Sequence, residues 1–600
     1  MSDNVVVGID FGTAGIGYAF SFDSQPNNII ESDFIGQGFG KKIPTEIILT
    51  PDSKYVLAFG EECKDYIKKA EDKKINENND NINHDDVEYE YYKDIKMNLY
   101  KKEYKIKSTK GKEEDIEIII TKLLEKVAEN ALSQIRDVYN NHSIVKKNVK
   151  WVLTVPAIWE EKSKQIMINA SIKAGLIDEN NDKSLFLALE PEVASIYYIK
   201  KLLNQKNKEF DYISQGNPYI ICDIGAGTVD ICTHRRVIEN NENLELIEEY
   251  PPIGGDFGGS KINEEFINRL IVPLFGEENV NKLKYNIANW KNWNNLEEEI
   301  EKAKRSCSSN ISHNVSQFTR LDCHMFDDDD CDEPLDYFIS EYNKKDLKHK
   351  YKLRKEKPLK KKNWVLEFDS NIFYDIMKEL AQKIVSKLEE IYKSVHTNFI
   401  IFTGAGSNNA TLINYIQCFA REKNIFFTYK ITLYPETTIM KGAVLFGFQR
   451  EIIRKRKAKY TLGIQINSKW EDKYQEHGKR NFLQCQNDYY CTNLFSKFIT
   501  RNQYIEFNDI IRKYYIALDK KTNIAFFKTN RDNCTYTDEK DENGNLIIHE
   551  FGSVIFNIDE DYDRNQKDIV IEMKLGGTYI DVNAIYVKTG KRLNVIQNFC

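Results

Sequence analysis

One short pattern occurs twice in this chain, at residues 7–13 and again at residues 221–228. Each copy is an apolar stretch that ends in Asp, and Gly and Thr follow within a few residues. Glycine lets successive backbone N–H groups curl around an anion, because no Cβ stands in the way. The Asp carboxylate supplies the hard oxygen that Mg²⁺ prefers. Two such turns predict a duplicated fold whose halves close on a nucleoside triphosphate from opposite sides.

We expect the two Asp residues to organise the water shell of Mg²⁺, while backbone amides and Thr hydroxyls hold the β- and γ-phosphates. A single glycine turn after a strand is common in α/β folds, and an Asp before such a turn also caps it locally. A structural turn is therefore the alternative at each position, and the repetition favours the phosphate site. The predicted residues are Asp10, Gly12 and Thr13 in the first copy, and Asp223, Gly225, Gly227 and Thr228 in the second.

Length and composition limit the function classes. A chain of 600 residues with 41% apolar content predicts several domains with sizeable cores. Its net charge of −7 argues against a general nucleic-acid surface. We expect no membrane partner either, because the sequence contains no run of about 18 apolar residues. The eleven cysteines occur without a C-x-x-C pair, which favours reduced thiols and a cytoplasmic location.

Apolar runs alternate with helical spacing along the first 450 residues, which predicts an α/β fold. The expected elements include a hairpin over 5–22, a helix over 115–139 and a strand over 151–157 followed by a helix over 164–174. A further apolar strand at 399–403 ends in a glycine turn that contains Gly404 and Gly406, and we expect this turn to face a ligand.

Charged and polar stretches mark the boundaries. The polar stretch 69–86 is expected to loop out of its domain, and the charged stretch 322–363 to form an exposed insertion, with a partner-binding arm as the alternative. The basic run 454–459 marks a domain boundary, and the short alternating strands after it predict a separate β domain.

Three further stretches, residues 151–159, 187–195 and 441–447, complete a family resemblance. Together with the two turns they resemble the seventy-kilodalton heat-shock proteins of the actin, sugar-kinase and heat-shock ATPase superfamily, and in particular their divergent 12A/12B branch. The resemblance implies a duplicated, two-lobed, actin-like ATPase domain at 1–450 and a basic linker at 451–459. It also implies a β-sandwich-like, substrate-binding domain at 460–600 that has no helical lid.

The resemblance assigns further roles. Glu190 is similar to the residue that orients the attacking water, and residues 301–308 are similar to the helix that contacts adenosine. On that helix the three-and-four spacing places four side chains on one face, although an ordinary ion-paired helix surface has the same spacing. These four are Glu301, Lys304, Arg305 and Ser308, and by the same resemblance Gly258, Gly259, Gly404 and Gly406 complete the nucleotide site.

The chain also departs from the family pattern. Ala14 and Gly15 replace a hydroxyl residue and a bulky residue, which predicts slower hydrolysis. The lysine that the family brings to the γ-phosphate has two candidates here, Lys93 and Lys96. The apolar, acid-ended linker of typical members is absent from the run before residue 460, which places the usual coupling between domains in doubt.

The leading hypothesis is an ATP-binding, heat-shock-like, chaperone-related protein that slowly hydrolyses ATP to ADP and phosphate with Mg²⁺. Its β domain would contact polypeptide clients or co-chaperones. One alternative is a nucleotide-binding scaffold or sensor with little hydrolysis, and another is a small-molecule kinase of the same superfamily.

Overall fold

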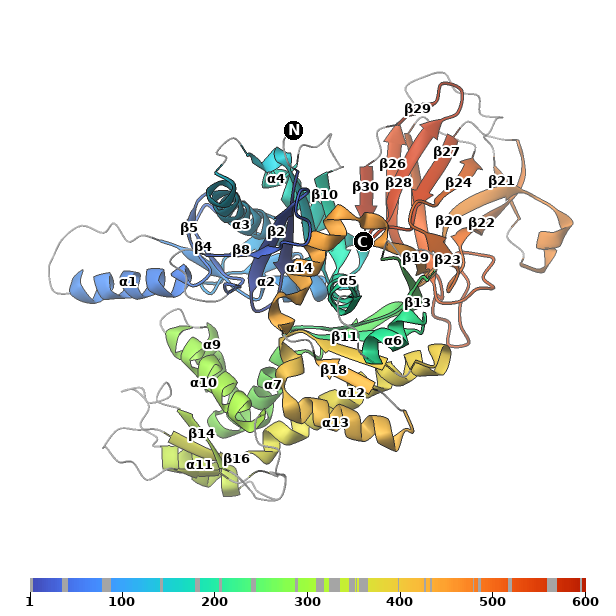
Figure 1. Ribbon diagram of the computed structural model, residues 1–600. Coiled ribbons are helices and arrows are strands. Elements are labelled where there is room, and N and C mark those ends of the chain that lie inside the picture. The colour runs from blue at the N-terminus through green and yellow to red at the C-terminus, as the bar shows by residue number, and fades with distance from the viewer. Residues whose placement is uncertain are drawn as a thin grey trace.

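The computed structural model describes residues 4–34, 41–77, 88–140, 144–177, 184–203, 208–238, 244–285, 290–308, 318–322, 335–344, 351, 353–355, 365–397, 399–425, 428–431, 434–477, 480–483, 487–515, 521–557, 569–593 and 596–599. These residues form a mixed α/β protein with several sheets (Figure 1). None of the helices in this described part is both long and apolar enough to cross a membrane.

The first copy of the repeated pattern lies in a sheet with the order β10-β9-β1-β2-β3, called the first sheet below. β1 and β2 form the predicted antiparallel hairpin, while β9 runs parallel to β1 and β10 runs parallel to β9. β3 pairs with β2 in the antiparallel direction. The bounds are β1 Val5–Phe11, β2 Ile16–Phe22, β3 Ile30–Glu31, β9 Val149–Val155 and β10 Leu185–Leu189.

The second copy lies in a sheet with the order β18-β17-β11-β12-β13-β19-β23, called the second sheet. Its part from β18 to β13 repeats the order and the strand directions of the first sheet, with an antiparallel hairpin β11–β12 and parallel neighbours β17 and β18. The chain therefore builds one arrangement twice. The bounds are β11 Tyr219–Ile224, β12 Val229–Arg236, β13 Leu246–Gly255, β17 Phe399–Thr403, β18 Thr428–Ile431, β19 Ile453–Lys457 and β23 Tyr504–Glu506.

Two helices, α5 (Glu190–Leu203) and α14 (Pro435–Phe448), share a hydrophobic core with strands of both sheets. Glycine permits the close packing, because a Cβ on Gly442 of α14 would lie 1.9 Å from the carbonyl oxygen of Val193 in α5. A Cβ on Gly8 of β1 would lie 2.6 Å from the carbonyl oxygen of Met440. The two halves are thus joined through α5 and α14.

Other helices cover the outer faces of the two sheets. The predicted helix at 115–139 is confirmed as α3 (Ile116–Tyr139), which begins at Asp115, where the side chain accepts a hydrogen bond from the backbone N–H of Glu117. With α4 it packs against the first sheet. The remaining helices are α1 Glu62–Glu77, α2 Ile95–Tyr100, α4 Glu161–Lys173, α6 Lys208–Ser214, α7 Gly259–Phe266, α8 Val272–Phe275, α9 Glu277–Tyr285, α10 Trp290–Ser308, α11 Leu335–Lys344, α12 Asn371–Val395 and α13 Ala410–Glu422.

The predicted loop at 69–86 is wrong as far as Glu77, because residues 62–77 form α1. Cys63 and Ile67 are buried in the first turns of this helix and pack with Ile48, which gives the polar stretch a folded start. Residues 78–87 lie outside the described part.

Most of the predicted insertion at 322–363 also lies outside the described part. The described residues also form three small sheets, with the orders β5-β4-β6, β7-β8 and β14-β16-β15. The bounds are β4 Ile47–Leu49, β5 Val56–Phe59, β6 Glu90–Tyr92, β7 Lys105–Lys107, β8 Glu113–Asp115, β14 Phe318–Asp322, β15 Leu353–Lys355 and β16 Val365–Asp369.

Apart from β23, the described strands from Thr461 onward form two further sheets, drawn in orange and red in Figure 1. Both contribute to one hydrophobic core, which includes Phe526 and Val554 from one sheet and Ile571 and Val582 from the other. One sheet has the order β21-β22-β20-β25-β26-β30 and the other β24-β27-β28-β29. The bounds are β20 Thr461–Lys469, β21 Arg480–Leu483, β22 Asp488–Ile499, β24 Ile510–Tyr515, β25 Lys521–Thr529, β26 His549–Asn557, β27 Ile569–Lys574, β28 Asp581–Tyr586, β29 Lys591–Arg592 and β30 Ile596–Phe599.

The segment predicted as a basic linker contains strand β19. β19 runs parallel to β13 and antiparallel to β23, so it belongs to the second sheet. Arg456, its fourth residue, is buried, whereas Arg454 and Lys455 are partly exposed. The basic run therefore combines a buried guanidinium with solvated charges in one strand.

Candidate functional site

The two repeated turns have the same hydrogen bond. The N–H of Gly12 donates to the carbonyl oxygen of Gly15 over 3.1 Å, and the N–H of Gly225 donates to that of Thr228 over 2.9 Å. Each turn begins two residues after a buried Asp at the end of a central strand, Asp10 on β1 and Asp223 on β11. Similar sequences thus build the same local structure in both halves.

The turns face each other across the two halves. A Cβ on Gly227 would lie 2.6 Å from Oγ1 of Thr13 and 2.3 Å from the sulfur of Met97. A Cβ on Gly258 would lie 2.6 Å from the carbonyl oxygen of Ala226. Any larger residue at 227 or 258 would force backbone or side chains apart, so these glycines allow the closest approach of the loops.

Gly404 must be glycine for two reasons, its backbone conformation and the lack of space for a side chain. Its φ is +78°, a left-handed conformation that side chains rarely adopt, and a Cβ there would lie 2.4 Å from Oδ1 of Asp223. Gly406 is equally close to β11, because its Cβ would lie 2.4 Å from Cγ2 of Ile224. The glycine turn after β17 therefore packs directly on the strand that carries Asp223.

A cleft of about 880 Å³ lies in front of the turns. Residues of both halves line it, and so do many of the predicted site residues. Those that line it are Thr13, Gly225, Gly259, Glu301, Lys304, Arg305 and Gly406. Those that do not line it directly are Asp10, Gly12, Glu190, Asp223, Gly227, Thr228, Gly258 and Gly404, which lie in or next to the same turns and strands or in the buried cluster described below. The side chain of Ser308 lies outside the described residues.

On α10, one predicted face is held by ion pairs. Glu301 accepts from Nζ of Lys304 over 2.5 Å and from Nε of Arg305 over 3.0 Å. Asn263 of α7 donates to the same carboxylate, and Lys304 also donates to the carbonyl oxygen of Gly259. Burial lowers the pKa of Lys304 against the opposing effect of Glu301. Three of the four predicted side chains, Glu301, Lys304 and Arg305, therefore share a face that lines the cleft, and their ion pairs are those of the alternative, an ion-paired helix surface.

Behind the turns lies a buried charged cluster. Nζ of Lys96 forms an ion pair with Glu190, and their side chains are only 5% and 6% exposed. Burial raises the pKa of Glu190 to about 7 although Lys96 opposes the shift. Burial lowers the pKa of Lys96, but Glu190 and Asp10 outweigh this effect and raise it overall. Lys96 is thus the cation that compensates these carboxylates.

Asp223 is a further buried carboxyl of the cluster. Burial, together with the charges of Glu190 and Asp230, raises its pKa well above the usual range. Its Oδ1 is buried and has no hydrogen-bond partner among the described residues. Such an unpaired buried oxygen costs free energy unless a donor or a cation reaches it. The site is therefore built to receive a positively charged or hydrogen-bonding group.

Sequence reasoning missed two members of this site. Asp230 of β12 lies opposite Asp223 in the hairpin register and accepts a hydrogen bond from the N–H of Ile158. Lys42 lies with Nζ 2.5 Å from Oδ2 of Asp10. The register of the hairpin offered a signal for Asp230. Lys42 comes from a separate segment, so no local pattern pointed to it.

The structure separates the two candidate lysines. Lys93 lines the cleft and forms an ion pair with Glu297 of α10 over 2.8 Å, with Asn294 as a further acceptor. Lys96 instead lies in the buried cluster with Glu190. Lys93 thus bridges the two halves at the rim of the cleft, and Lys96 lies beside the turns.

Comparison with known proteins supports the family resemblance. No protein-family model matches the chain. Heat shock 70 kDa protein 12A of Mus musculus and of Homo sapiens are each 24% identical to it over 666 residues, covering 99% of this chain and 91% of the relative. The chain is thus similar over nearly its whole length to the 12A/12B branch of the heat-shock 70 kDa proteins. Heat shock 70 kDa protein 12B of Homo sapiens is 24% identical over 581 residues, covering 86% of this chain and 78% of the relative. The similarity to heat-shock 70 proteins thus includes the cleft and the strands after residue 460.

Proposed function

We propose that the chain binds ATP with Mg²⁺ in the cleft between its two halves and hydrolyses it slowly, as an actin-like ATPase. The single observation that carries this proposal is the pair of identically closed Asp–Gly–Thr turns that face each other in front of buried carboxylates. The repeated strand order and the heat-shock 70 relatives support it.

The residues present fit a nucleotide with its metal. Asp10 and Asp223 would hold Mg²⁺ through water, and the unpaired Oδ1 of Asp223 offers an acceptor for that water. Thr13, Thr228 and the backbone amides of the turns would hold the β- and γ-phosphates. When bound, Mg²⁺ neutralises phosphate charge during phosphoryl transfer. The adenosine would lie against the α10 face, where the planar Arg305 guanidinium is 76% exposed and would stack on the purine while it stays paired with Glu301.

In this proposal Glu190 orients the attacking water, and Lys96 positions Glu190. The pKa of Glu190, about 7, leaves a carboxylate that can accept a proton from water near neutral pH. Slow turnover follows from Ala14, which lines the cleft and offers no hydroxyl to the phosphates. The same residue supports the second candidate, a nucleotide sensor that scarcely hydrolyses ATP.

A single-turnover experiment tests the proposal. Full-length protein in excess is mixed with ATP and Mg²⁺, and bound nucleotide and released phosphate are followed over time. We expect tight binding with slow release of phosphate, and loss of both in Asp10→Asn and Asp223→Asn. Asp52→Asn is the matched control, because Asp52 lies on a surface turn and its side chain is 49% exposed. Binding without release would establish the sensor, and absence of binding would refute both candidates.

We further propose that the strands after residue 460 contact polypeptide. In the part of this region that the structure describes, β24 forms one edge of its sheet, and Ile510 and Tyr514 on it are 42% and 53% exposed. An exposed apolar edge is a surface to which an extended chain can add. Fluorescence anisotropy with a labelled, unfolded polypeptide tests this, with Tyr514→Glu expected to weaken binding. Tyr55→Glu is the control, since Tyr55 is 69% exposed in the first half.

A further inference from the structure

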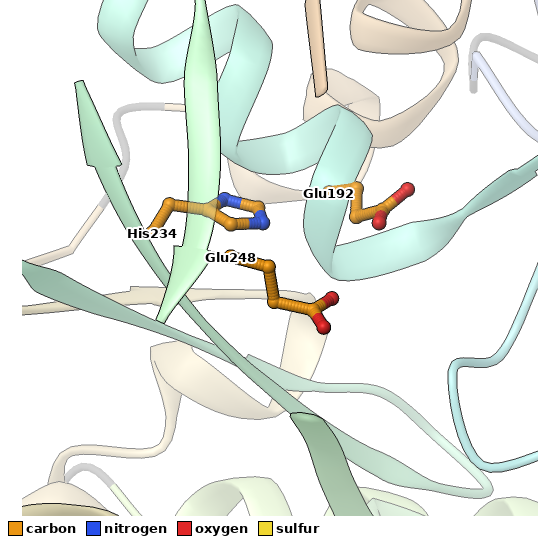
Figure 2. A group of neighbouring side chains, drawn as sticks. All are labelled: Glu192, His234 and Glu248. Atoms are coloured by element: carbon orange, nitrogen blue, oxygen red, sulfur yellow. The ribbon is translucent and has the colours of Figure 1, made fainter. Parts of the chain in front are cut away.

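A second buried cluster lies outside the cleft. Glu192 on α5, His234 on β12 and Glu248 on β13 are 0%, 0% and 1% exposed. One potential ligand atom from each lies within 4.8 Å of the others. Figure 2 shows the imidazole ring and the two carboxylates arranged around a common space. Three elements that are far apart in the sequence thus bring one nitrogen and two carboxylates together.

Two of these groups present unpartnered atoms. Nε2 of His234 and Oε2 of Glu248 are buried and have no hydrogen-bond partner among the described residues. The opposite atom of each group is held in place. Nδ1 of His234 lies 3.0 Å from Oγ of Ser195, and Oε1 of Glu248 accepts from the N–H of Lys457 over 2.9 Å. Each of the two side chains is therefore held through one polar atom and leaves its other polar atom without a hydrogen-bond partner in the described part of the chain.

Among the described residues, Arg456 forms an ion pair with one of the two carboxyl groups of the cluster. Arg456 compensates Glu192 with two hydrogen bonds of 2.8 Å, from Nε and from Nη2. Glu248 accepts a backbone N–H, and among the described residues no cationic side chain forms an ion pair with it. Nε2 of His234 and Oε2 of Glu248 do not form a hydrogen bond with each other. A carboxylate buried this deeply either takes up a proton or is balanced by a cation, and a cation bound between the three groups would balance it.

We propose that Glu192, His234 and Glu248 form a site for a divalent transition metal of the Zn²⁺ class. One imidazole and two carboxylates are a ligand set that Zn²⁺ accepts. The contact of Nδ1 with Ser195 is the outer-shell interaction that fixes a metal-binding histidine. Glu192 retains lone pairs for a metal while Arg456 holds it, because a carboxylate offers about four acceptor positions.

An access route and a structural consequence follow from the surroundings. Glu248 and Arg456 line a cavity of about 200 Å³. Residues 575 and 577–580 of the C-terminal strands line the same cavity. Nη1 of Arg456 donates to the carbonyl oxygen of Gly576 over 2.5 Å. A bound metal would link α5, β12 and β13 next to the contact between Arg456 and Gly576. The site is separate from the nucleotide cleft and does not depend on the proposed ATPase activity.

The test uses full-length protein that has been stripped with a chelator and contains no nucleotide. Zn²⁺ binding is measured by calorimetry and by metal analysis after dialysis, and Co²⁺ is used as a spectroscopic probe. We expect one metal per chain, a Co²⁺ spectrum of nitrogen and oxygen ligands without thiolate charge transfer, and a higher melting temperature with Zn²⁺. His234→Gln and Glu248→Gln should abolish this stoichiometric binding, and circular dichroism checks that they fold.

Ser195→Ala provides a variant that keeps all three ligands. It should weaken Zn²⁺ binding by roughly 10- to 100-fold, as expected for an outer-shell partner. His549→Gln removes an exposed imidazole on β26 and should bind Zn²⁺ like the parent protein. Unchanged stoichiometry in His234→Gln and Glu248→Gln, or a Co²⁺ spectrum with thiolate charge transfer, would overturn the proposal. The proposal would also be overturned if the stripped protein took up a proton at Glu248 and bound no metal.

Discussion

The buried charges near the cleft differ in their surroundings. Lys96 compensates Glu190, and the surrounding carboxylates keep its ammonium protonated. Lys93 has a different environment, because its partner Glu297 is 40% exposed and solvent screens the pair. Two lysines three positions apart in the sequence therefore have unequal roles.

Lys96→Met should abolish phosphate release in single turnover, because Glu190 loses the group that positions it. It should also lower the free energy of unfolding by about 3–5 kcal/mol, the usual cost of leaving one member of a buried ion pair alone. Lys93→Met should cost about 0–1 kcal/mol and leave phosphate release measurable. Denaturant titration and the phosphate assay measure both. Equal losses in the two variants would contradict the distinction between the two sites.

Gly227→Ala tests the approach of the two turns. Its Cβ would overlap with Met97 and Thr13, and such overpacking costs about 1–3 kcal/mol. If the turns hold one nucleotide between them, ATP affinity should fall roughly 5- to 100-fold. Gly577→Ala adds the same methyl where the nearest atom is 3.7 Å away, and should leave ATP affinity unchanged. Equilibrium binding of labelled ATP measures the affinity of each variant. Equal affinities in the two variants would contradict a shared site.

At the scale of elements, strand β19 could not be predicted from local sequence patterns. Hydrophobic spacing predicted α3, and helical spacing predicted the shared face of α10, because both patterns are local. The run from Arg454 to Lys459 has no apolar alternation, so it indicated a boundary and gave no strand. In the second sheet it pairs with β13 and β23, and its Arg456 forms an ion pair with Glu192, which is far away in the sequence. No local pattern contains that information.

The Arg456–Glu192 pair allows a double-mutant test. Arg456→Met alone should lower the free energy of unfolding by about 3–5 kcal/mol, because it leaves Glu192 buried without a partner. Combining it with Glu192→Met should recover part of that loss, since buried ion pairs are often replaced by apolar residues at little cost. Arg454→Met, which breaks a partly exposed pair with Glu245, should cost about 0–1 kcal/mol. Strictly additive losses in the double variant would show that the pair is not coupled.

At the scale of the whole molecule, duplication was readable from the sequence because each half repeats its turn residues. The repeated strand order follows the same duplication. The contacts of α4 and β19 with the C-terminal strands could not be predicted from the sequence. They involve backbone groups, such as the carbonyl oxygens of Gly576 and Thr578, which any sequence supplies. Residues 576–580 thereby contact both β19 and α4.

The contact between α4 and residues 576–580 gives the last prediction. Oε2 of Glu161 accepts from the N–H of Ile580 over 3.0 Å, and Nζ of Lys164 donates to the carbonyl oxygen of Thr578 over 2.9 Å. Hydrogen bonds to charged groups contribute about 1.5–3 kcal/mol, so Glu161→Ala should speed amide exchange at 576–580 by roughly 10- to 150-fold. Lys173→Met removes another charge of α4, one that pairs with Glu117 and is 60% exposed, and should leave this exchange unchanged. Hydrogen-exchange mass spectrometry compares the two variants. If Glu161→Ala left the exchange at 576–580 as slow as in the parent protein, these hydrogen bonds would not be what holds the C-terminal strands against α4, and the contacts of Arg456 would have to do so alone.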